Sequence, residues 1–306
     1  MLSISTSWIS GKTKNAEKII RETETLGVDA VELDYRIHTK TFNEMVPILK
    51  KSPLAVSSIH NFFPVPAELL HRKGCGDLFS LAHPDKEIRN TAVKFTTRTI
   101  EIAHSLEAPV IVLHCGYLDM ESESHELIDL CKNGMPLTEK GIAFLKKQTD
   151  KLEKIKPAYL DALMFSIDKL LQVAMKEHVS LGLETRYYLY ELPGYDDFDL
   201  LFKEFKGAPL GYWHDTGHAR SQELQYLIPE NGYLNRYGNK LIGMHIHDSE
   251  GFSDHMPPGL GEIDFKKVFS FIKPDTISVI ELRSGYSTDE IKGGINHVRA
   301  LIAENR

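Results

Sequence analysis

Acidic and histidine side chains that could bind a metal ion recur where short apolar runs of this sequence end. Four successive runs of this kind end at or near Glu184, Asp215, His245 and Glu281. Carboxylate oxygens and imidazole nitrogens are common protein ligands of divalent metal ions. A single residue of this kind is more often a hydrogen-bonded structural residue, but four at successive runs favour a shared site. We therefore predict a metal centre built from these four side chains.

Further side chains of the same types stand near other apolar runs. His60 closes the third run, His114 lies near the end of the fourth, and His218 follows Asp215 by three residues. Glu32 and Asp34 lie on the second run and fit rim salt bridges as well as they fit a function. The remaining histidines outside these runs fall in expected helices or loops, and we interpret them as structural: His38, His71, His83, His104, His125, His178 and His297.

The elements that must position these residues alternate along the chain. Apolar runs typical of buried strands are separated by segments with helical spacing, which indicates βα units and a parallel sheet. The expected helices include residues 15–26, 41–51, 87–106, 157–178 and 264–272. The expected strands are residues 2–8, 30–35, 54–60, 110–116, 180–185, 211–216, 241–248 and 277–282.

Eight such units predict an α/β fold, a single closed (β/α)8 TIM barrel spanning residues 1–306. No glycine-rich phosphate-binding sequence follows the first run, which counts against a dinucleotide-binding sheet. In a barrel, the carboxyl ends of all strands meet at the face that carries the active site. Two connections, residues 117–156 and 219–240, are longer than a βα unit needs and are candidate helical insertions or lids.

Composition narrows the function classes. The chain has 306 residues, 36 Lys and Arg against 43 Asp and Glu, and a formal net charge of −7. This balance lacks the basic footprint of a nucleic-acid-binding protein, and no apolar run reaches the length of a membrane span. Cys75, Cys115 and Cys131 are odd in number and lack metal-like spacing. With no secretory signal pattern at the start, we expect a cytoplasmic protein without disulfides; its oligomeric state is open.

The motifs together resemble the xylose isomerase-like TIM-barrel superfamily, which includes sugar and sugar-phosphate isomerases, ketose 3-epimerases and endonuclease IV. Each motif is short, but their order and spacing cover nearly the whole chain. The matching stretches are SSIHNFFP (57–64), VIVLHCG (110–116), LGLETR (181–186), HDTGHA (214–219), MHIHDSEG (244–251), DHMPPGLGEIDF (254–265) and VIEL (279–282).

The resemblance implies roles for the residues at matching positions. Glu184 and Glu281 look like the acid–base pair of the epimerase branch and, with Asp215 and His245, like its four metal ligands. His218 resembles an epimerase residue that contacts substrate, or a ligand of a second metal in endonuclease IV. The other candidates for a second metal or for substrate binding, again by this resemblance, are His60, His114 and His255.

One departure separates the chain from endonuclease IV. That nuclease carries an Asp-x-His pair after its seventh strand, whereas Asp254 and His255 are adjacent here. A third metal ion is therefore not implied by the motif. The PPGLGEIDF stretch that follows instead resembles the isomerase and epimerase branch.

The chemistry expected of the site follows from its donors. Three carboxylates and one imidazole suit Mn²⁺, Mg²⁺ or Co²⁺, and additional histidines would favour Zn²⁺. A metal ion beside two carboxylates suits proton transfer next to a carbonyl, through an enediolate. We therefore expect an isomerase or epimerase whose partner is a sugar or sugar phosphate. The alternatives are an endonuclease IV-like phosphodiesterase and a non-catalytic barrel.

Cationic side chains beside the same strand ends could bind an anionic part of a substrate. A guanidinium holds a phosphate or carboxylate through two hydrogen bonds. Arg36 and Arg220 are interpreted as surface salt-bridge partners. Arg186, Arg283 and His247 remain as candidate substrate-binding residues.

Overall fold

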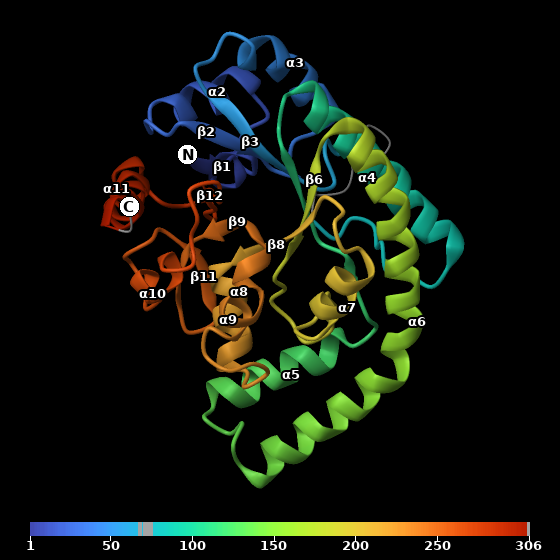
Figure 1. Ribbon diagram of the computed structural model, residues 1–306. Coiled ribbons are helices and arrows are strands. Elements are labelled where there is room, and N and C mark those ends of the chain that lie inside the picture. The colour runs from blue at the N-terminus through green and yellow to red at the C-terminus, as the bar shows by residue number, and fades with distance from the viewer. Residues whose placement is uncertain (67–68, 70–75, 305–306) are drawn as a thin grey trace.

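Eight parallel strands form a closed barrel in the computed structural model, which describes residues 1–66, 69 and 76–304 (Figure 1). Around the barrel the strands follow the order β1-β12-β9-β8-β6-β4-β3-β2. The predicted TIM barrel and its eight strands are confirmed. The strands are β1 (Leu2–Ser5), β2 (Ala30–Leu33), β3 (Ala55–His60), β4 (Val110–Leu113), β6 (Ser180–Glu184), β8 (Leu210–Asp215), β9 (Leu241–Ile246) and β12 (Ile277–Ile280).

The barrel interior is filled by side chains rather than left open. Trp213 packs there with Val110, Val112 and Val279, below the ends of the strands. A Cβ atom at Gly243 would lie 2.1 Å from the Trp213 ring, so the neighbouring strand can carry only glycine at this point. Because side chains alternate along a strand, Asp215 faces the same interior two residues after Trp213. The packed indole of Trp213 thus closes the barrel interior directly below the polar side chains at the strand ends.

Helices surround the barrel, and their buried faces pack on the outer side of the strands. The expected helix at residues 157–178 is the second half of a much longer one, because the preceding segment is also helical and is capped by Thr138. Helices at the other expected positions are present. The helices are α1 (Ser7–Ser10), α2 (Ala16–Glu24), α3 (Thr39–Leu49), α4 (Lys86–Ser105), α5 (Glu121–Lys132), α6 (Glu139–Glu177), α7 (Asp197–Glu204), α8 (Thr216–Leu224), α9 (Gly232–Tyr237), α10 (Phe265–Phe269) and α11 (Thr288–Glu304), with a 3₁₀ turn η2 (Gly238–Lys240).

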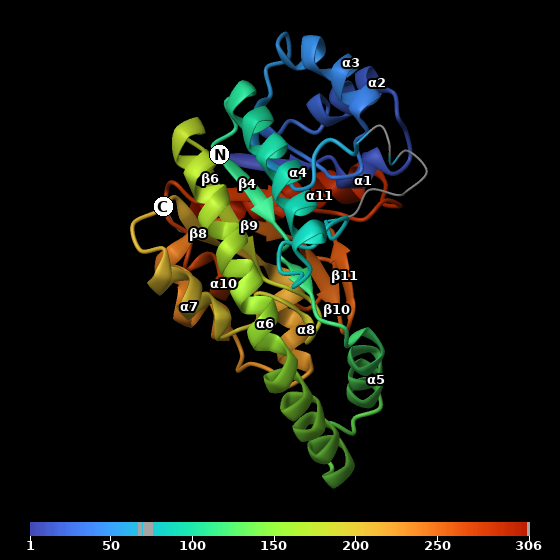
Figure 2. The same ribbon diagram turned by 90° about the vertical axis from the view of Figure 1, so that its right-hand side faces the viewer.

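The two long connections are built differently. Residues 117–156 contain α5 and the first part of α6, which lie side by side and project beyond the barrel (Figures 1 and 2). Residues 219–240 contain most of α8, then α9 and η2, and stay close to the barrel wall. Two short two-stranded antiparallel sheets complete the described fold. They pair β5 (Gly116–Tyr117) with β7 (Glu191–Leu192), and β10 (Asp248–Glu250) with β11 (Ser253–Met256).

Two sequence expectations concern features outside the barrel. Cys115 and Cys131 are free thiols, while Cys75 and His71 lie outside the described residues. Among the described helices, none combines the length and the apolar character that a membrane crossing requires.

Candidate metal centre

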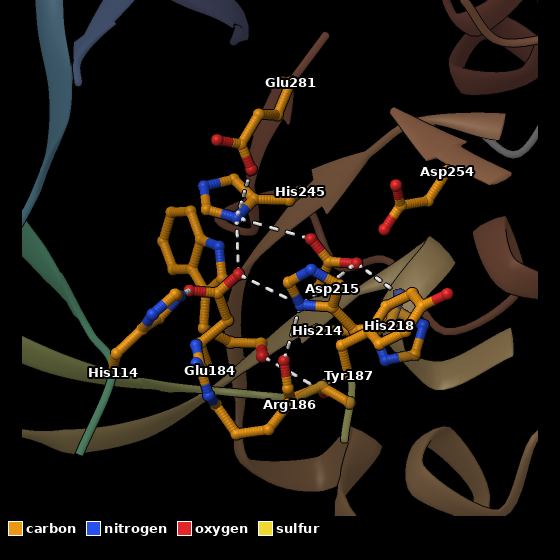
Figure 3. Close-up of polar contacts among 12 residues, drawn as sticks. His114, Glu184, Arg186, Tyr187, His214, Asp215, His218, His245, Asp254 and Glu281 are labelled. Carbon is orange, nitrogen blue, oxygen red and sulfur yellow. Dashed lines mark hydrogen bonds and ion pairs between the residues drawn. The ribbon is translucent and has the colours of Figure 1, made fainter. Parts of the chain in front are cut away.

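Four buried side chains converge at the carboxyl ends of neighbouring strands. Glu184 ends β6, Asp215 ends β8, His245 lies on β9, and Glu281 directly follows β12. Their potential ligand atoms all lie within 4.8 Å of one another (Figure 3). The Nδ1 atom of His245 is 3.0 Å from Glu184 Oε1, 3.1 Å from Glu281 Oε2 and 3.7 Å from Asp215 Oδ2. We call this set the central cluster.

Strand register explains why these residues meet. The parallel pairing of β8 with β9 places Asp215 directly beside His245. The pairing of β9 with β12 places His245 beside Val279, so Glu281 projects from the next interior-facing position. Three carboxylates and one imidazole can therefore surround a point above Trp213.

A second cluster shares Glu184 with the first. The Nε2 atoms of His60 and His114 lie 3.2 Å and 2.9 Å from Glu184 Oε2. The Nδ1 atom of His60 faces the carbonyl oxygen of Asn61 at 2.8 Å, and that of His114 faces Asp77 Oδ2 at 2.9 Å. Because each Nδ1 can donate a proton to these acceptors, each Nε2 can bind a cation once it has released any proton of its own.

The Oε2 atom of Glu184 offers a test of whether these residues fit a metal ion. It is buried and has no hydrogen-bond partner in the described part of the chain, although two imidazole nitrogens are close. A buried carboxylate oxygen without a partner is costly unless a cation or donor satisfies it. Gly76 keeps the space open, since a Cβ there would lie 2.5 Å from His114 Nδ1. The donor set and the unpaired oxygen both fit a divalent ion.

A third cluster lies at the outer edge of the site. His218 on α8 and the adjacent Asp254 and His255 on β11 present ligand atoms within the same 4.8 Å limit. In sequence, the adjacency of Asp254 and His255 does not imply a third metal position. Their side chains nevertheless turn to one side, since His255 adopts a left-handed φ of 56°. We call this set the outer cluster.

The charges of the central cluster support one another. Burial alone would raise the pKa of Glu184 and Glu281, but neighbouring imidazoles more than offset this and hold both values well below the ordinary range. Burial would likewise lower the pKa of His245, and the carboxylates of Glu281, Glu32 and Glu184 raise it well above its usual value. Both glutamates are therefore ionised at neutral pH, as ligands and as bases must be.

A buried ion-pair network supports His114 from behind. Asp77 contacts both His114 and the guanidinium of Arg186, which lies 2.8 Å away. Arg186 also pairs with Glu191, and its side chain is only 2% exposed. Arg186 thus lies behind the site and holds Asp77, which differs from the expected contact with a substrate. Asp77 follows no strand and belongs to no motif, so no local sequence pattern points to it.

Two other residues orient ligands rather than a substrate. Glu32 lies 3.1 Å from His245 Nε2 through each of its oxygens, which assigns this carboxylate to the centre rather than to a rim salt bridge. His247 accepts the backbone N–H of His255 on Nδ1, so its Nε2–H donates to Asp215 at 3.0 Å. Carboxylate–histidine contacts of this kind fix ring orientation and ligand basicity.

The remaining expected substrate contact lies at the rim. Arg283 is exposed and donates to the Ser253 hydroxyl and to the Tyr286 hydroxyl. Asp34, the other rim candidate, pairs with Arg36 at 2.6 Å and accepts from Ser10. Of the arginines beside strand ends, Arg283 is therefore the one that the structure leaves at the edge of the mouth.

Known proteins with this architecture act on sugars in several cases. The structure of 3-keto-D-glucoside 4-epimerase YcjR from E. coli matches with a TM-score of 0.67 at 15% identity, covering 98% of each chain. D-psicose 3-epimerase from Clostridium cellulolyticum matches with a TM-score of 0.67 at 14% identity, covering 98% of this chain and 99% of that chain. TTHB071 from Thermus thermophilus, in a structure soaked with ZnCl₂, matches with a TM-score of 0.59 at 16% identity. The match covers 100% of this chain and 98% of that chain. At these identities the likeness establishes the fold.

Sequence comparison gives the family. An uncharacterised protein, y4fM from Sinorhizobium fredii, is 26% identical over 214 residues, which cover 70% of this chain and 57% of that protein. The chain thus spans less than two thirds of that relative. The family model for the xylose isomerase-like TIM barrel matches residues 20–301. The protein belongs to the xylose isomerase-like TIM barrel family.

Proposed function

We propose that the protein is a divalent-metal-dependent isomerase or epimerase of a sugar or sugar phosphate, with Glu184 and Glu281 as its acid–base pair. The observation that carries this proposal is the placement of the two glutamates. One ends β6 and the other follows β12, and β8 and β9 lie between these two strands in the barrel. Both carboxylates nevertheless reach within 3.1 Å of His245 Nδ1. Two ionised carboxylates thus flank one small space.

A divalent ion bound in the central cluster would polarise the substrate carbonyl and stabilise the negative charge that develops on its oxygen. The chain's own groups carry out the proton transfers. One glutamate removes the proton from the carbon next to the carbonyl, and the electron pair moves into an enediolate. Return of a proton to the opposite face of the same carbon by the other glutamate inverts that carbon. Return to the neighbouring carbon exchanges aldose and ketose.

Residues beyond the glutamates keep the reacting groups in place. Glu32 holds His245, and His247 holds Asp215, so neither central ligand can rotate freely. His218 donates Nδ1–H to the carbonyl oxygen of Thr185 at 3.0 Å, which leaves Nε2 facing the mouth. That nitrogen can contact a substrate hydroxyl, and Arg283 at the rim could hold a phosphate if the sugar carries one.

The test is incubation of Mn²⁺-loaded protein with a panel of ketoses, aldoses and their phosphates in deuterated water. We expect deuterium to enter the carbon next to the carbonyl of both recovered substrate and product, followed by NMR. The matched control is Glu153→Gln, which removes an exposed carboxylate on α6 far from the site. Turnover without deuterium incorporation would exclude the enediolate route.

A second candidate function rests on one specific observation, the sharing of Glu184 between the central cluster and the His60–His114 pair. A carboxylate that bridges two ions suits hydrolysis of a phosphoester by an activated water. In that state Glu184 would not be free to act as a base. Elemental analysis of the active form, together with assays on phosphodiesters and abasic DNA, separates the two. One ion with sugar turnover supports isomerisation; two or three ions with phosphoester turnover support hydrolysis.

A further inference from the structure

Tyr35 lies beside the metal centre, and the acid–base chemistry described above does not use it. It follows the last residue of β2 by two positions, at the face of the barrel where the strands end. Its ring meets the His60 ring edge-on, with 4.7 Å between the ring centroids. The His60 ring in turn stacks on the His245 ring at 5.7 Å. One imidazole therefore separates the phenol from a ligand of the central cluster.

The charged groups of the site act on this phenol. Burial raises the pKa of Tyr35 well above its ordinary value, and the guanidinium of Arg36 lowers it. The carboxylates of Asp34, Glu281 and Glu184 raise the pKa again. Because the interaction of two charges weakens with distance, both glutamates of the acid–base pair lie near the phenol. A phenol is neutral at pH 7, so the hydroxyl keeps its proton and can donate a hydrogen bond.

The hydroxyl group of Tyr35 accepts one hydrogen bond and has a proton left to donate. Arg36 Nη2 donates to it at 2.7 Å, while Nη1 of the same guanidinium pairs with Asp34 at 2.6 Å. Within the described residues, no acceptor faces the hydroxyl's own proton. The hydroxyl of Tyr187, which follows β6, instead donates its proton to the carbonyl oxygen of Phe252 at 2.8 Å. A hydroxyl that accepts from a cation becomes a stronger donor, because linked hydrogen bonds polarise one another.

We propose that Tyr35 is a further catalytic residue, whose hydroxyl donates a hydrogen bond to the substrate oxygen on which negative charge develops. This inference rests on the proposed isomerase or epimerase function. Arg36 is a positioning residue that holds the hydroxyl oxygen from behind. A donor placed at developing charge stabilises the transition state more than the ground state. The hydroxyl keeps its proton throughout, and the carbon-bound proton still passes through Glu184 and Glu281.

The test uses a mimic of the enediolate, so that it does not depend on turnover. Glycolohydroxamate carries two adjacent oxygens, as an enediolate does, and it can bind a divalent ion without reacting. Calorimetric titration of the Mn²⁺-loaded full chain should show saturable binding. Tyr35→Phe keeps the ring beside His60 but removes the hydroxyl. It should weaken hydroxamate binding at least about tenfold, as is usual for the loss of a hydrogen bond to a charged group.

Matched variants show whether the effect belongs to this hydroxyl. Tyr226→Phe removes a hydroxyl from a residue that is 55% exposed beyond the end of α8, and it should retain the wild-type affinity. Arg36→Lys keeps a cation beside Asp34 but cannot contact both Asp34 and Tyr35, so hydroxamate binding should weaken about threefold. The double variant Tyr35→Phe/Arg36→Lys should bind no more weakly than Tyr35→Phe, because Arg36 acts through the hydroxyl.

Kinetics with a sugar that the protein turns over give a second readout. Tyr35→Phe should lower kcat by roughly 10²–10³-fold, as is found when one donor to a developing oxyanion is removed. KM should change less than about threefold, because the hydrogen bond strengthens as the charge develops. The Mn²⁺ content of the variant should equal that of the wild type.

The outcomes separate the role of Tyr35 from the function of the protein. If sugars are turned over but Tyr35→Phe binds the hydroxamate as Tyr226→Phe does, the function stands and this role is overturned. Loss of Mn²⁺ from Tyr35→Phe, or no hydroxamate binding by the Mn²⁺-loaded wild type, also overturns it. If Tyr35→Phe loses hydroxamate affinity but no sugar is turned over, the isomerase function fails and the contact with the oxygen stands. Additive losses in the double variant would remove the positioning role of Arg36.

Discussion

The central and outer clusters offer the same kinds of ligand from different parts of the fold. The side chains of Glu184, Asp215, His245 and Glu281 are at most 4% exposed and come from the ends of barrel strands. In the outer cluster, by contrast, the side chains of His218, Asp254 and His255 are 11%, 24% and 25% exposed. They come from a helix and a hairpin. Strand ends fixed by a closed barrel hold donors in place, whereas a hairpin can shift.

Support from neighbouring groups follows the same division. In the central cluster His245 is held by Glu32 and Asp215 is held by His247. In the outer cluster His255 Nδ1 lies 3.0 Å from Asp254 Oδ1, so each residue uses one of its potential metal-ligand atoms on the other. Preorganised ligands lose less conformational entropy on binding. We therefore expect the central cluster to bind an ion more tightly than the outer cluster.

The largest effect is expected from Glu184→Gln, because this carboxylate belongs to both the central cluster and the His60–His114 pair. Gln keeps the shape and one oxygen ligand but removes the base. Activity should fall by roughly 10²–10⁴-fold, as is usual for the loss of a proton-transfer partner. Steady-state assays and metal analysis provide the measurement, with Glu153→Gln as control. If the outer cluster lost its ion as well, the two clusters would not be independent.

A smaller loss, of metal affinity, is expected from Asp77→Asn, which tests whether Asp77 positions His114 as a ligand. Asp77 accepts from His114 Nδ1 and is itself held by Arg186. Replacement of such outer partners typically lowers metal affinity about 10–100-fold. Titration with Mn²⁺, followed by electron paramagnetic resonance, measures the change. The comparison variant is Asp254→Asn, whose effect should be confined to the weaker, outer ion; unchanged affinity in Asp77→Asn would remove its positioning role.

A pH dependence of intermediate size follows from His114. Burial and Arg186 lower its pKa, but Asp77 and Glu184 more than offset this and raise it to about 9. A raised pKa stabilises the metal-free fold fully below the unfolded value of 6.5 and loses this contribution as pH rises toward about 9. Metal binding displaces the proton, so affinity should increase about tenfold per pH unit over the same range. Unfolding and Mn²⁺ titrations from pH 6 to 9 measure both trends, and a pH-independent affinity would contradict them.

The smallest effect is expected from His255→Ala. This change removes one donor from the outer cluster and leaves the four central ligands intact. Under the isomerase proposal, activity should decrease less than about tenfold, because the residue lies outside the acid–base pair. Elemental analysis should show the central ion retained. A loss as large as that of Glu184→Gln would instead favour hydrolysis with several ions.

Much of the barrel could be predicted from the sequence, because strands buried on both faces must be continuous apolar runs. The eight runs and their polar ends directly gave the strand positions and four residues that the structure brings together. Helix boundaries were less accessible. Pro157 favours a helix start, yet α6 continues through it because tertiary packing and the cap at Thr138 extend the helix.

The contacts between distant segments could not be obtained from local pattern. Behind His114, Arg186 contacts both Asp77 and Glu191. Asp77 is distant from Arg186 in the chain, and neither Asp77 nor Glu191 belongs to a motif. Arg186 shows the consequence, because its type and position next to a strand end suggested a substrate contact. Its burial between two carboxylates is a property of the assembled loops alone.

The sequence by itself determined which residue types stand at strand ends, because alternation and burial impose a pattern on every strand of a closed barrel. Tertiary structure alone decided which of them share an ion, which support a neighbour, and which face outward. His214 and Asp215 illustrate the difference. They are adjacent in the chain, but the pleat of β8 directs one into an outer cavity and the other into the central cluster. The local sequence pattern determines that successive side chains point to opposite faces of the strand. Only the closed barrel determines which other residues lie on each face.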